Sequence, residues 1–284
     1  MVTDRLKKIS DSVFIDPDFK QDLENIGLSN IDNIFSFNQG LNLAKKNISK
    51  HRNRVQIELK DRQTTIFLKR YTNPPIITQL KNWLIANKII SSALLDFEPS
   101  EKLSELGINT PKTVLLAQQW GKVFEKRSAI ATQQVPNSQS LEKRLPSFIT
   151  ESNIKNNLKV KFIKDLAEFI KKFHSTGYRH RDLYFAHIFY NQNENIFHLI
   201  DLARAFKPVI FKSRFTIKDL AQLYYSAPAK FFTRADRLRF YKTYSGKNKL
   251  THKDKFVIHK IKLKLDKMAK HDKKHNRIAP YANQ

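Results

Sequence analysis

The clearest pattern in the first half of the chain is a pair of short apolar segments joined by a polar turn. Apolar residues alternate with polar ones through 54–59, and a second apolar run ends at Lys69. Alternation with a period of two is typical of a half-buried strand. Residues 54–71 are therefore predicted to form a β-hairpin with Lys69 near its end, and the Asn-Pro-Pro sequence at 73–75 is expected to stop the second strand.

Helical spacing of the apolar residues follows this hairpin. Residues 76–106 have this spacing and end just before Gly107, a residue type that often terminates helices. Two shorter apolar segments, 108–120 and 123–135, are predicted to be strands. The first half of the chain is thus expected to be rich in β-structure.

The second half is predicted to be mostly helical. Apolar residues recur at helical spacing in 158–177, 217–227 and 253–270, and the last segment carries lysines on its other side. The polar sequence PNSQS at 136–140 is the expected hinge between two lobes.

Together these elements predict an α+β protein of two lobes. The β-rich N-lobe would span residues 1–135, and the helical C-lobe, with its basic C-terminal helix, would span residues 136–284. Residues 1–53 show no motif and are not assigned within the N-lobe.

Composition and charge narrow the possible partners. Hydrophobic residues make up 40% of the 284 residues, which is typical of a packed globule, and the absence of Cys excludes disulfides and thiolate metal sites. No apolar stretch is long enough for a transmembrane helix, and the N-terminus lacks the apolar core of a secretion signal. A formal net charge of +26 predicts an anionic partner, and charge alone leaves nucleic acid, an anionic membrane face and a polyanionic substrate open.

The most informative segments are His-Arg-Asp-Leu-Tyr-Phe-Ala-His at 180–187 and Ile-Asp-Leu at 200–202. Asp182 follows a predicted helix, and the apolar run before Asp201 predicts a hairpin that returns to the same region. Phosphoryl transfer needs one carboxylate to orient the attacking hydroxyl and another to hold magnesium. It also needs a lysine from a separate strand, held by an acidic helix residue, and Lys69 meets this requirement.

These segments resemble the lipopolysaccharide core heptose kinases, a family with the protein-kinase-like fold. The sequence HRDLYFAHIFY matches the family's HRD-x-Y-x-x-H loop, and HLIDLARAF matches its IDL-x-R-A metal-binding segment. IFLKRY, SELGINTP and KDLAQLYYSA match further family segments in the same order, so the resemblance covers residues 54–245. It implies a kinase that uses ATP and Mg²⁺ to phosphorylate a heptose hydroxyl of the lipopolysaccharide inner core.

The resemblance also implies roles for individual residues. Asp182 would be the catalytic base and Asp201 the magnesium ligand. His187 stands where protein kinases have Asn, and it would either fill the second metal-side position or hydrogen-bond the loop. Lys69 would contact the α- and β-phosphates of the nucleotide.

Four further residues complete the expected site. His180 and Arg181 belong to the catalytic loop, and His180 is expected to support the loop backbone. Asp219 would anchor that backbone from the following helix. Arg204, in the IDL-x-R segment, is a candidate contact for an acidic substrate.

The sequence departs from the family pattern at the nucleotide. The family's helix glutamate falls on Asp96, whose side chain is one methylene shorter, so Glu98 and Glu101 are alternative partners for Lys69. The chain has six glycines and no G-x-G-x-x-G loop, which implies a modest affinity for the nucleotide.

The family resemblance implies a cytoplasmic enzyme, peripheral to the inner membrane of a Gram-negative bacterium. Its partner would be the lipopolysaccharide core glycolipid in an anionic leaflet, which the positive charge suits, and nucleic acid is not the expected partner. Two alternatives stay open. One is a kinase for another core sugar such as Kdo, and the other is a pseudokinase-like basic module that binds RNA or membrane.

Overall fold

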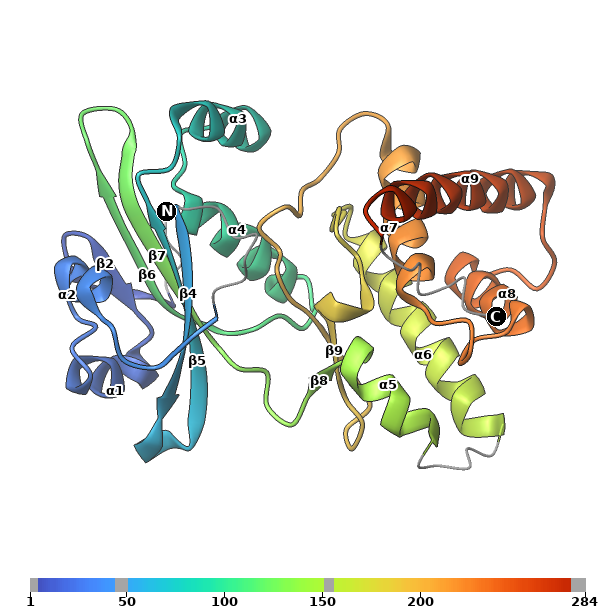
Figure 1. Ribbon diagram of the computed structural model, residues 1–284, viewed down its shortest axis with the longest axis horizontal. Helices are drawn as coiled ribbons and strands as arrows, with labels where there is room; N and C mark the ends of the chain where they lie inside the picture. The colour runs from blue at the N-terminus through green and yellow to red at the C-terminus, as the bar shows by residue number, and fades with distance from the viewer. Residues whose placement is uncertain (1–4, 44–50, 151–155, 277–284) are drawn as a thin grey trace. The chain divides into compact units, whose positions relative to one another are not determined.

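The computed structural model describes residues 5–43, 51–150 and 156–276. The chain divides into two compact units, each of which is described by itself (Figure 1). The first unit comprises Met1–Lys102 and Thr110–Val135, and the second comprises Leu103–Asn109 and Pro136–Gln284.

The first unit is built on a seven-stranded antiparallel sheet with the order β1-β2-β6-β7-β5-β4-β3. Its strands are β1 (Lys7–Ser10), β2 (Val13–Ile15), β3 (Leu41–Asn42), β4 (Arg52–Leu59), β5 (Thr64–Thr72), β6 (Thr113–Trp120) and β7 (Glu125–Gln133). The predicted hairpin is confirmed as β4 and β5. Lys69 lies on β5, opposite Arg54 on one side and Ile130 on the other.

The helices of this unit are η1 (Pro17–Phe19), α1 (Lys20–Asn25), α2 (Ile31–Ser36), η2 (Lys60–Arg62), α3 (Ile76–Ala86) and α4 (Ser92–Glu105). Residues 76–106, whose apolar spacing is helical, form two helices, because Asn87 adopts the left-handed conformation with φ of 53° and ends α3. Asparagine tolerates that conformation better than most residues, and the apolar spacing gives no sign of the break.

Both faces of the sheet are covered. Leu115 and Ala129 belong to a core cluster that includes residues of α1 and α2. Their chain neighbours Leu116 and Ile130 point to the opposite face and join Phe97 of α4 in a separate cluster. Since successive side chains on a strand alternate between faces, the apolar runs of β6 and β7 are buried on both sides.

Residues before 53, which sequence patterns left unassigned, contribute to this unit. Val13 and Ile15 of β2 are fully buried, and Phe19, Leu23 and Ile34 pack into the same cluster. Strands and helices of two to six residues are too short to show a clear hydrophobic period, which explains why they were missed.

The second unit is mostly helical. It contains α5 (Leu141–Thr150), α6 (Asn156–Ser175), η3 (Phe185–His187), α7 (Lys212–Ser226), α8 (Arg234–Ser245) and α9 (His252–Lys274). A three-stranded sheet of β8 (Gln139–Ser140), β9 (Ile188–Asn191) and β10 (Ile196–Leu199) has the order β10-β9-β8. The structure confirms the predicted helices as α6, α7 and α9, whereas α5 and α8 were not predicted.

The core of the second unit includes a segment from an earlier part of the chain. Leu103 and Ile108 are buried in its large apolar cluster. Asn109 binds the edge of β10, because its side-chain amide donates to the Phe197 carbonyl and its carbonyl accepts from the Leu199 amide. These contacts assign residues 103–109 to the second unit.

No helix in the described ranges is long and apolar enough to cross a bilayer. The apolar residues of α3 are instead exposed at the surface of the first unit, with Ile77 and Leu84 exposed to 68% and 82%.

Candidate active site

In the first unit, Lys69 and Asp96 form a buried ion pair. The Nζ of Lys69 lies 2.6 Å from the Oδ2 of Asp96, and the two side chains are only 6% and 7% exposed. The hydroxyl of Tyr71 also donates to this carboxylate, at 3.4 Å. A lysine can be buried in its charged form only when an anion compensates for the loss of water, and Asp96 supplies that anion.

The shorter side chain of Asp96 reaches Lys69, so the alternatives raised by the sequence are resolved geometrically. Glu98 lies 2.7 Å from Lys88, and Glu101 pairs with Arg5. Residues two apart on a helix point about 200° away from each other, so Glu98 cannot share the sheet-facing side of α4 with Asp96.

The start of α4 is fixed by a second buried carboxylate. Glu125 of β7 accepts hydrogen bonds from the amide and hydroxyl of Ser92, and from the hydroxyl of Ser128. Burial raises the pKa of Glu125 above its ordinary value, and these three donors oppose that rise. The carboxylate thereby ties the helix that carries Asp96 to the sheet that carries Lys69.

In the second unit, Asp219 of α7 holds the loop that contains Asp182. Asp219 is fully buried and accepts from the amides of His180 and Arg181, each at 2.8 Å. The ring of His174 makes a third contact, with its Nε2 3.3 Å from Oδ2. A buried carboxylate with several donors has little freedom to move, so it fixes the backbone just before Asp182.

Two more side chains on the same face of α7 extend this anchor. The Gln222 side chain accepts from the amide of Leu183, and the Ser226 hydroxyl accepts from the amide of Phe185. Asp219, Gln222 and Ser226 are spaced three and four residues apart, so they form one polar stripe along the helix. Sequence reasoning missed Gln222 and Ser226, although polar residues at this spacing in an apolar helix were the available signal.

The β9–β10 hairpin brings Asp201 back to the loop, as expected from the apolar run before it. The Nε2 of His180 donates to the carbonyl of Ile200 at 3.0 Å, and the amide of Ile200 donates to the carbonyl of His187. Arg181 and Asp201 both adopt positive φ, at 69° and 57°. Such conformations are uncommon outside glycine and occur often at functional sites.

His187 lies between the two aspartates. Its Nδ1 is 2.7 Å from the carbonyl of Asp182, so this nitrogen carries the proton that it donates. The Nε2 lies 3.8 Å from the Oδ2 of Asp201. The histidine therefore hydrogen-bonds the loop, which is one of the two roles left open by the sequence, and its other nitrogen faces Asp201.

The carboxylate of Asp201 fits a magnesium site that is completed by other ligands, whereas His187 offers only a ring nitrogen beside it. No group of three or more His, Asp and Glu residues that could hold a metal occurs in the described part of the chain. Magnesium in phosphoryl-transfer enzymes is usually held by one or two protein ligands together with phosphate oxygens and water. The carboxylate of Asp201 is a hard oxygen ligand of the preferred kind.

Asp182 is paired with Arg204. The Nη1 of Arg204 lies 2.8 Å and 3.1 Å from the two carboxylate oxygens. Both side chains are accessible, with Asp182 25% exposed and Arg204 54% exposed. The guanidinium thereby orients the carboxylate.

The predicted residues therefore form two groups. Lys69 and Asp96 come together in the first unit, while Glu98 is used elsewhere. The second unit contains the other seven predicted residues. Asp219 is the anchor, and it holds the part of the chain that carries His180, Arg181, Asp182, His187, Asp201 and Arg204.

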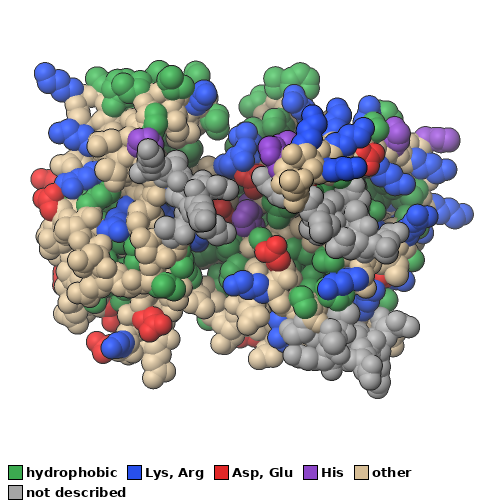
Figure 2. Space-filling model, in the orientation of Figure 1, with side chains coloured by type: hydrophobic (Ala, Val, Ile, Leu, Met, Phe, Trp, Pro, Cys, Tyr) green, Lys and Arg blue, Asp and Glu red, His purple; other side chains and the backbone are tan. Residues whose placement is uncertain are grey.

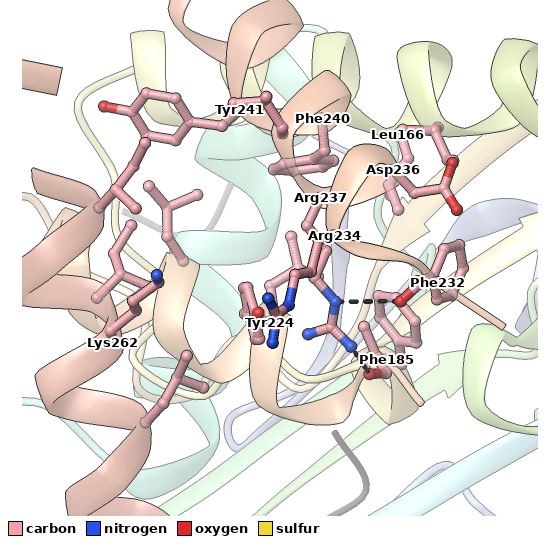
Figure 3. A pocket seen from close by; sticks show the side chains of 18 of the residues that line it. Leu166, Phe185, Tyr224, Phe232, Arg234, Asp236, Arg237, Phe240, Tyr241 and Lys262 are labelled. Carbon is pink, nitrogen blue, oxygen red and sulfur yellow. Dashed lines mark hydrogen bonds between the residues drawn. The ribbon is translucent and has the colours of Figure 1, made fainter. Parts of the chain in front are cut away.

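The second unit also contains an apolar cavity that sequence reasoning did not predict. It has a volume of about 700 Å³ and lies among α6, α7, α8 and α9 (Figure 3). Leu166, Phe185 and Phe232 line it, and Arg237 stacks over the ring of Tyr224 at 4.0 Å. Arg237 donates to the carbonyls of Phe232 and Ala227, and its Nη1 is buried with no hydrogen-bond partner among the described residues.

Comparison with known proteins identifies relatives of this chain. A family model described as the lipopolysaccharide kinase (Kdo/WaaP) family matches residues 91–244, which is more than half of the chain. The lipopolysaccharide core heptose(I) kinase WaaP of Pseudomonas aeruginosa is 28% identical over 170 residues, or 58% of this chain. That alignment spans 63% of the relative, less than two thirds of its length. The protein of the same name from Escherichia coli K12 is 27% identical over 187 residues, covering 63% of this chain and 70% of the relative.

A solved structure supports the fold. The structure titled "WaaP in complex with acyl carrier protein" superimposes with a TM-score of 0.66 at 20% identity, covering 90% of this chain and 98% of that one. This likeness confirms the predicted protein-kinase-like fold, with a β-rich and a mostly helical part.

The buried histidines predict a dependence of stability on pH. Burial lowers the pKa of both His174 and His180 below the ordinary value of 6.5. The unfolded chain then binds protons at a higher pH than the folded chain does. The free energy of unfolding should therefore fall as the pH decreases through about 6.5, by at most about 1.4 kcal/mol per pH unit for each histidine.

Urea unfolding at several pH values between 7.5 and 5.5 would measure this slope. His180→Gln should reduce it, because glutamine does not titrate and can still donate to the Ile200 carbonyl. His259→Gln, on the exposed surface of α9, is the matched control and should leave it unchanged. If the free energy of unfolding depends equally on pH in the wild type and in both variants, His180 is not a source of that dependence.

Proposed function

Because the chain belongs to the lipopolysaccharide kinase (Kdo/WaaP) family, we propose that it transfers the γ-phosphoryl group of ATP to a heptose hydroxyl of the lipopolysaccharide inner core. Relatives named heptose(I) kinases support the choice of acceptor. The observation that carries the proposal is the loop of Asp182, which Asp219 and the β9–β10 hairpin hold beside Asp201 and His187.

In this reaction Asp182 accepts the proton of the acceptor hydroxyl. The hydroxyl oxygen forms a new bond to the γ-phosphorus, the bond from that phosphorus to the bridging β-phosphate oxygen breaks, and ADP leaves. Arg204 is a positioning residue for the Asp182 carboxylate, and its exposed guanidinium is available to an acidic acceptor. Removing Arg204 would free the carboxylate to rotate.

The other predicted site residues would bind the nucleotide and its magnesium ion. Lys69, held by Asp96, neutralises the α- and β-phosphates. Asp201 and His187 are the residues that would hold a magnesium ion, which when bound supplies positive charge against the phosphate oxygens. His180 supports the loop rather than the chemistry, because its ring is fully buried.

The proposed acceptor is anionic and embedded in a membrane, which agrees with a formal net charge of +26. We therefore place the protein in the cytoplasm, in peripheral contact with the inner membrane of a Gram-negative bacterium. Kdo as the acceptor sugar and a non-catalytic module that binds RNA are the competing functions.

Asp182→Asn is expected to reduce phosphoryl transfer by on the order of 10²–10⁴-fold, because the amide cannot accept the proton. Asp201→Asn should be comparably damaging, because it removes the hard oxygen ligand. The measurement is transfer of label from γ-labelled ATP to core lipopolysaccharide stripped of phosphate, in the presence of magnesium. Asp61→Asn, an exposed carboxylate on η2, is the control and should retain activity.

A panel of acceptors separates the competing functions. Label on a Kdo acceptor but not on heptose would move the assignment to the other core sugar. Full activity of Asp182→Asn would refute its role as the base. Absence of label on every acceptor, with salt-sensitive RNA binding, would support the non-catalytic module.

The ion pair between Lys69 of β5 and Asp96 of α4 gives a second prediction. Asp96→Ala leaves Lys69 buried without its anion, and it should lower kcat/KM for ATP on the order of 10- to 100-fold. Glu98→Ala removes a carboxylate from the same helix whose partner, Lys88, is exposed, and it should change kcat/KM by about twofold or less. Equal effects of the two changes would show that the buried pair does not serve the nucleotide.

The apolar cavity is an argument for a further proposal, that this protein binds a partner protein. The solved WaaP structure is titled as a complex with acyl carrier protein. We propose that this chain binds such a carrier when an acyl chain is attached to it. A cavity of about 700 Å³ with apolar walls fits an acyl chain. The unpaired Nη1 of Arg237 is a donor for a polar group at the head of that chain.

Filling the cavity tests this partner. Ala227→Phe should weaken binding of a carrier loaded with a long acyl chain at least about tenfold, as measured by titration calorimetry, because it occupies the space of the chain. Ala235→Phe, at an exposed position of α8, is the control. Unloaded carrier that binds as tightly as loaded carrier would contradict the proposal.

A further inference from the structure

A second cavity in the helical unit has a strongly basic lining. It has a volume of about 660 Å³ and lies between α7, α9 and the catalytic loop. Its lining includes six cationic side chains, which are Arg181, Arg214, Lys218, Lys260, Lys264 and Lys267, and no carboxylate. We call it the basic groove. Figure 2 shows Lys and Arg side chains gathered over the region of α9.

The α9 side of the basic groove follows from helical geometry. Phe256, Lys260, Leu263, Lys264 and Lys267 are spaced so that they share one face of the helix. Ile261 and Leu265 lie on another face and are buried in the core. The helix is thus held by its apolar side, while Phe256 and Leu263 are left exposed among lysines, with Lys260 over the ring of Phe256 at 5.0 Å.

An exposed apolar loop immediately precedes α7, whose residues Ser213 and Arg214 line the basic groove. Val209, Ile210 and Phe211 directly precede this helix and are exposed to 88%, 67% and 65%. Phe211 also has φ of 54°, an unfavourable conformation for a bulky residue. Three consecutive exposed apolar side chains next to cationic ones are unusual for a surface that contacts only water, and they are typical of a lipid interface.

The groove is connected to the catalytic loop through Arg181. This residue lines the groove, its amide is fixed by Asp219, and its carbonyl accepts from Lys218. The Nε of Arg181 is buried without a hydrogen-bond partner in the described ranges. The next residue in the chain is Asp182, so an anion bound by Arg181 lies close to the proposed base.

We propose that the basic groove and the 209–211 loop bind the phosphorylated headgroup of a membrane-embedded anionic lipid, with the loop inserted into the bilayer. This rests on the proposed function, for which the lipid is the glycolipid acceptor. Lysine and arginine side chains bind phosphate oxygens by charge-assisted hydrogen bonds. The exposed loop favours a lipid over a free phosphate, because a soluble anion offers nothing to its apolar side chains.

The exposed apolar face of α3 in the first unit, with Ile77 and Leu84, independently fits the same class of partner. An anionic bilayer surface binds both cationic side chains and apolar ones, whereas the phosphates of a nucleic acid bind only the cationic side chains.

The test compares three variants of the full chain. In the groove variant, Lys260, Lys264 and Lys267 are each changed to Ala, and in the loop variant Ile210 and Phe211 are each changed to Ser. The control changes Lys253, Lys255 and Lys270 to Ala, which removes the same charge from positions on α9 outside the groove lining. Circular dichroism and thermal unfolding establish that each variant is folded.

Binding is measured by sedimentation with phosphatidylcholine vesicles, with and without phosphatidylglycerol. Each lysine near an anionic surface contributes about 1 kcal/mol, so the groove variant should lose on the order of 100-fold in affinity for the anionic vesicles. The control should lose much less. The loop variant should also bind vesicles more weakly, while its affinity for inorganic phosphate stays unchanged.

Three outcomes would overturn the inference. Equal losses in the groove variant and the control would show that only the overall charge matters. Unchanged vesicle binding by the loop variant would assign the groove to a soluble anion. Displacement from vesicles by a short RNA at lower concentration than the lipid would assign it to nucleic acid.

Activity on a water-soluble, deacylated core acceptor keeps this inference separate from the proposed function. A wild-type protein that phosphorylates no acceptor but binds anionic vesicles through the groove would refute the kinase and support the lipid site. Full activity on the soluble acceptor, with vesicle binding insensitive to the groove and loop variants, would refute the lipid site alone.

Discussion

The arrangement of the second unit depends on one buried carboxylate. Asp219 has no contact with water, and it can remain there only because two loop amides and His174 donate to it. The requirement that buried polar groups be satisfied works in both directions, since the loop amides would also be unpaired without Asp219. This mutual need fixes the backbone before Asp182 and the direction of Arg181. The candidate base and the basic groove therefore share one anchor.

Much of the fold was readable from the sequence because its longer elements have a clear period. The β4–β5 hairpin and helices α6, α7 and α9 each repeat their apolar residues several times, and the family motifs indicated the order of the acidic residues. Elements of two to six residues near the N-terminus do not complete enough repeats to be distinguished from loops. The break between α3 and α4 depends on the backbone conformation of Asn87, which apolar spacing does not encode.

The candidate site was predicted as a set of residues but not as a set of contacts. Asp96, Glu98 and Glu101 all lie on one helix, and the choice among them depends on how α4 is rotated by the packing of Phe97 and by the Glu125 anchor. The pairing of Arg204 with Asp182 and the direction of the His187 ring likewise depend on tertiary structure. The basic groove is lined by residues from three segments that are distant in the sequence, so no local sequence pattern predicts it.

The placement of residues 103–109 bears on how such proteins can be recombined. The chain passes from one unit to the other after Lys102, again after Asn109 and a third time after Val135. A chimera joined only at residue 135 would combine the helical part of one parent with Leu103, Ile108 and Asn109 of the other. Leu103 and Ile108 fill the core of the second unit, and Asn109 borders β10. Substitutions in this short segment must therefore remain compatible with residues that lie much later in the chain.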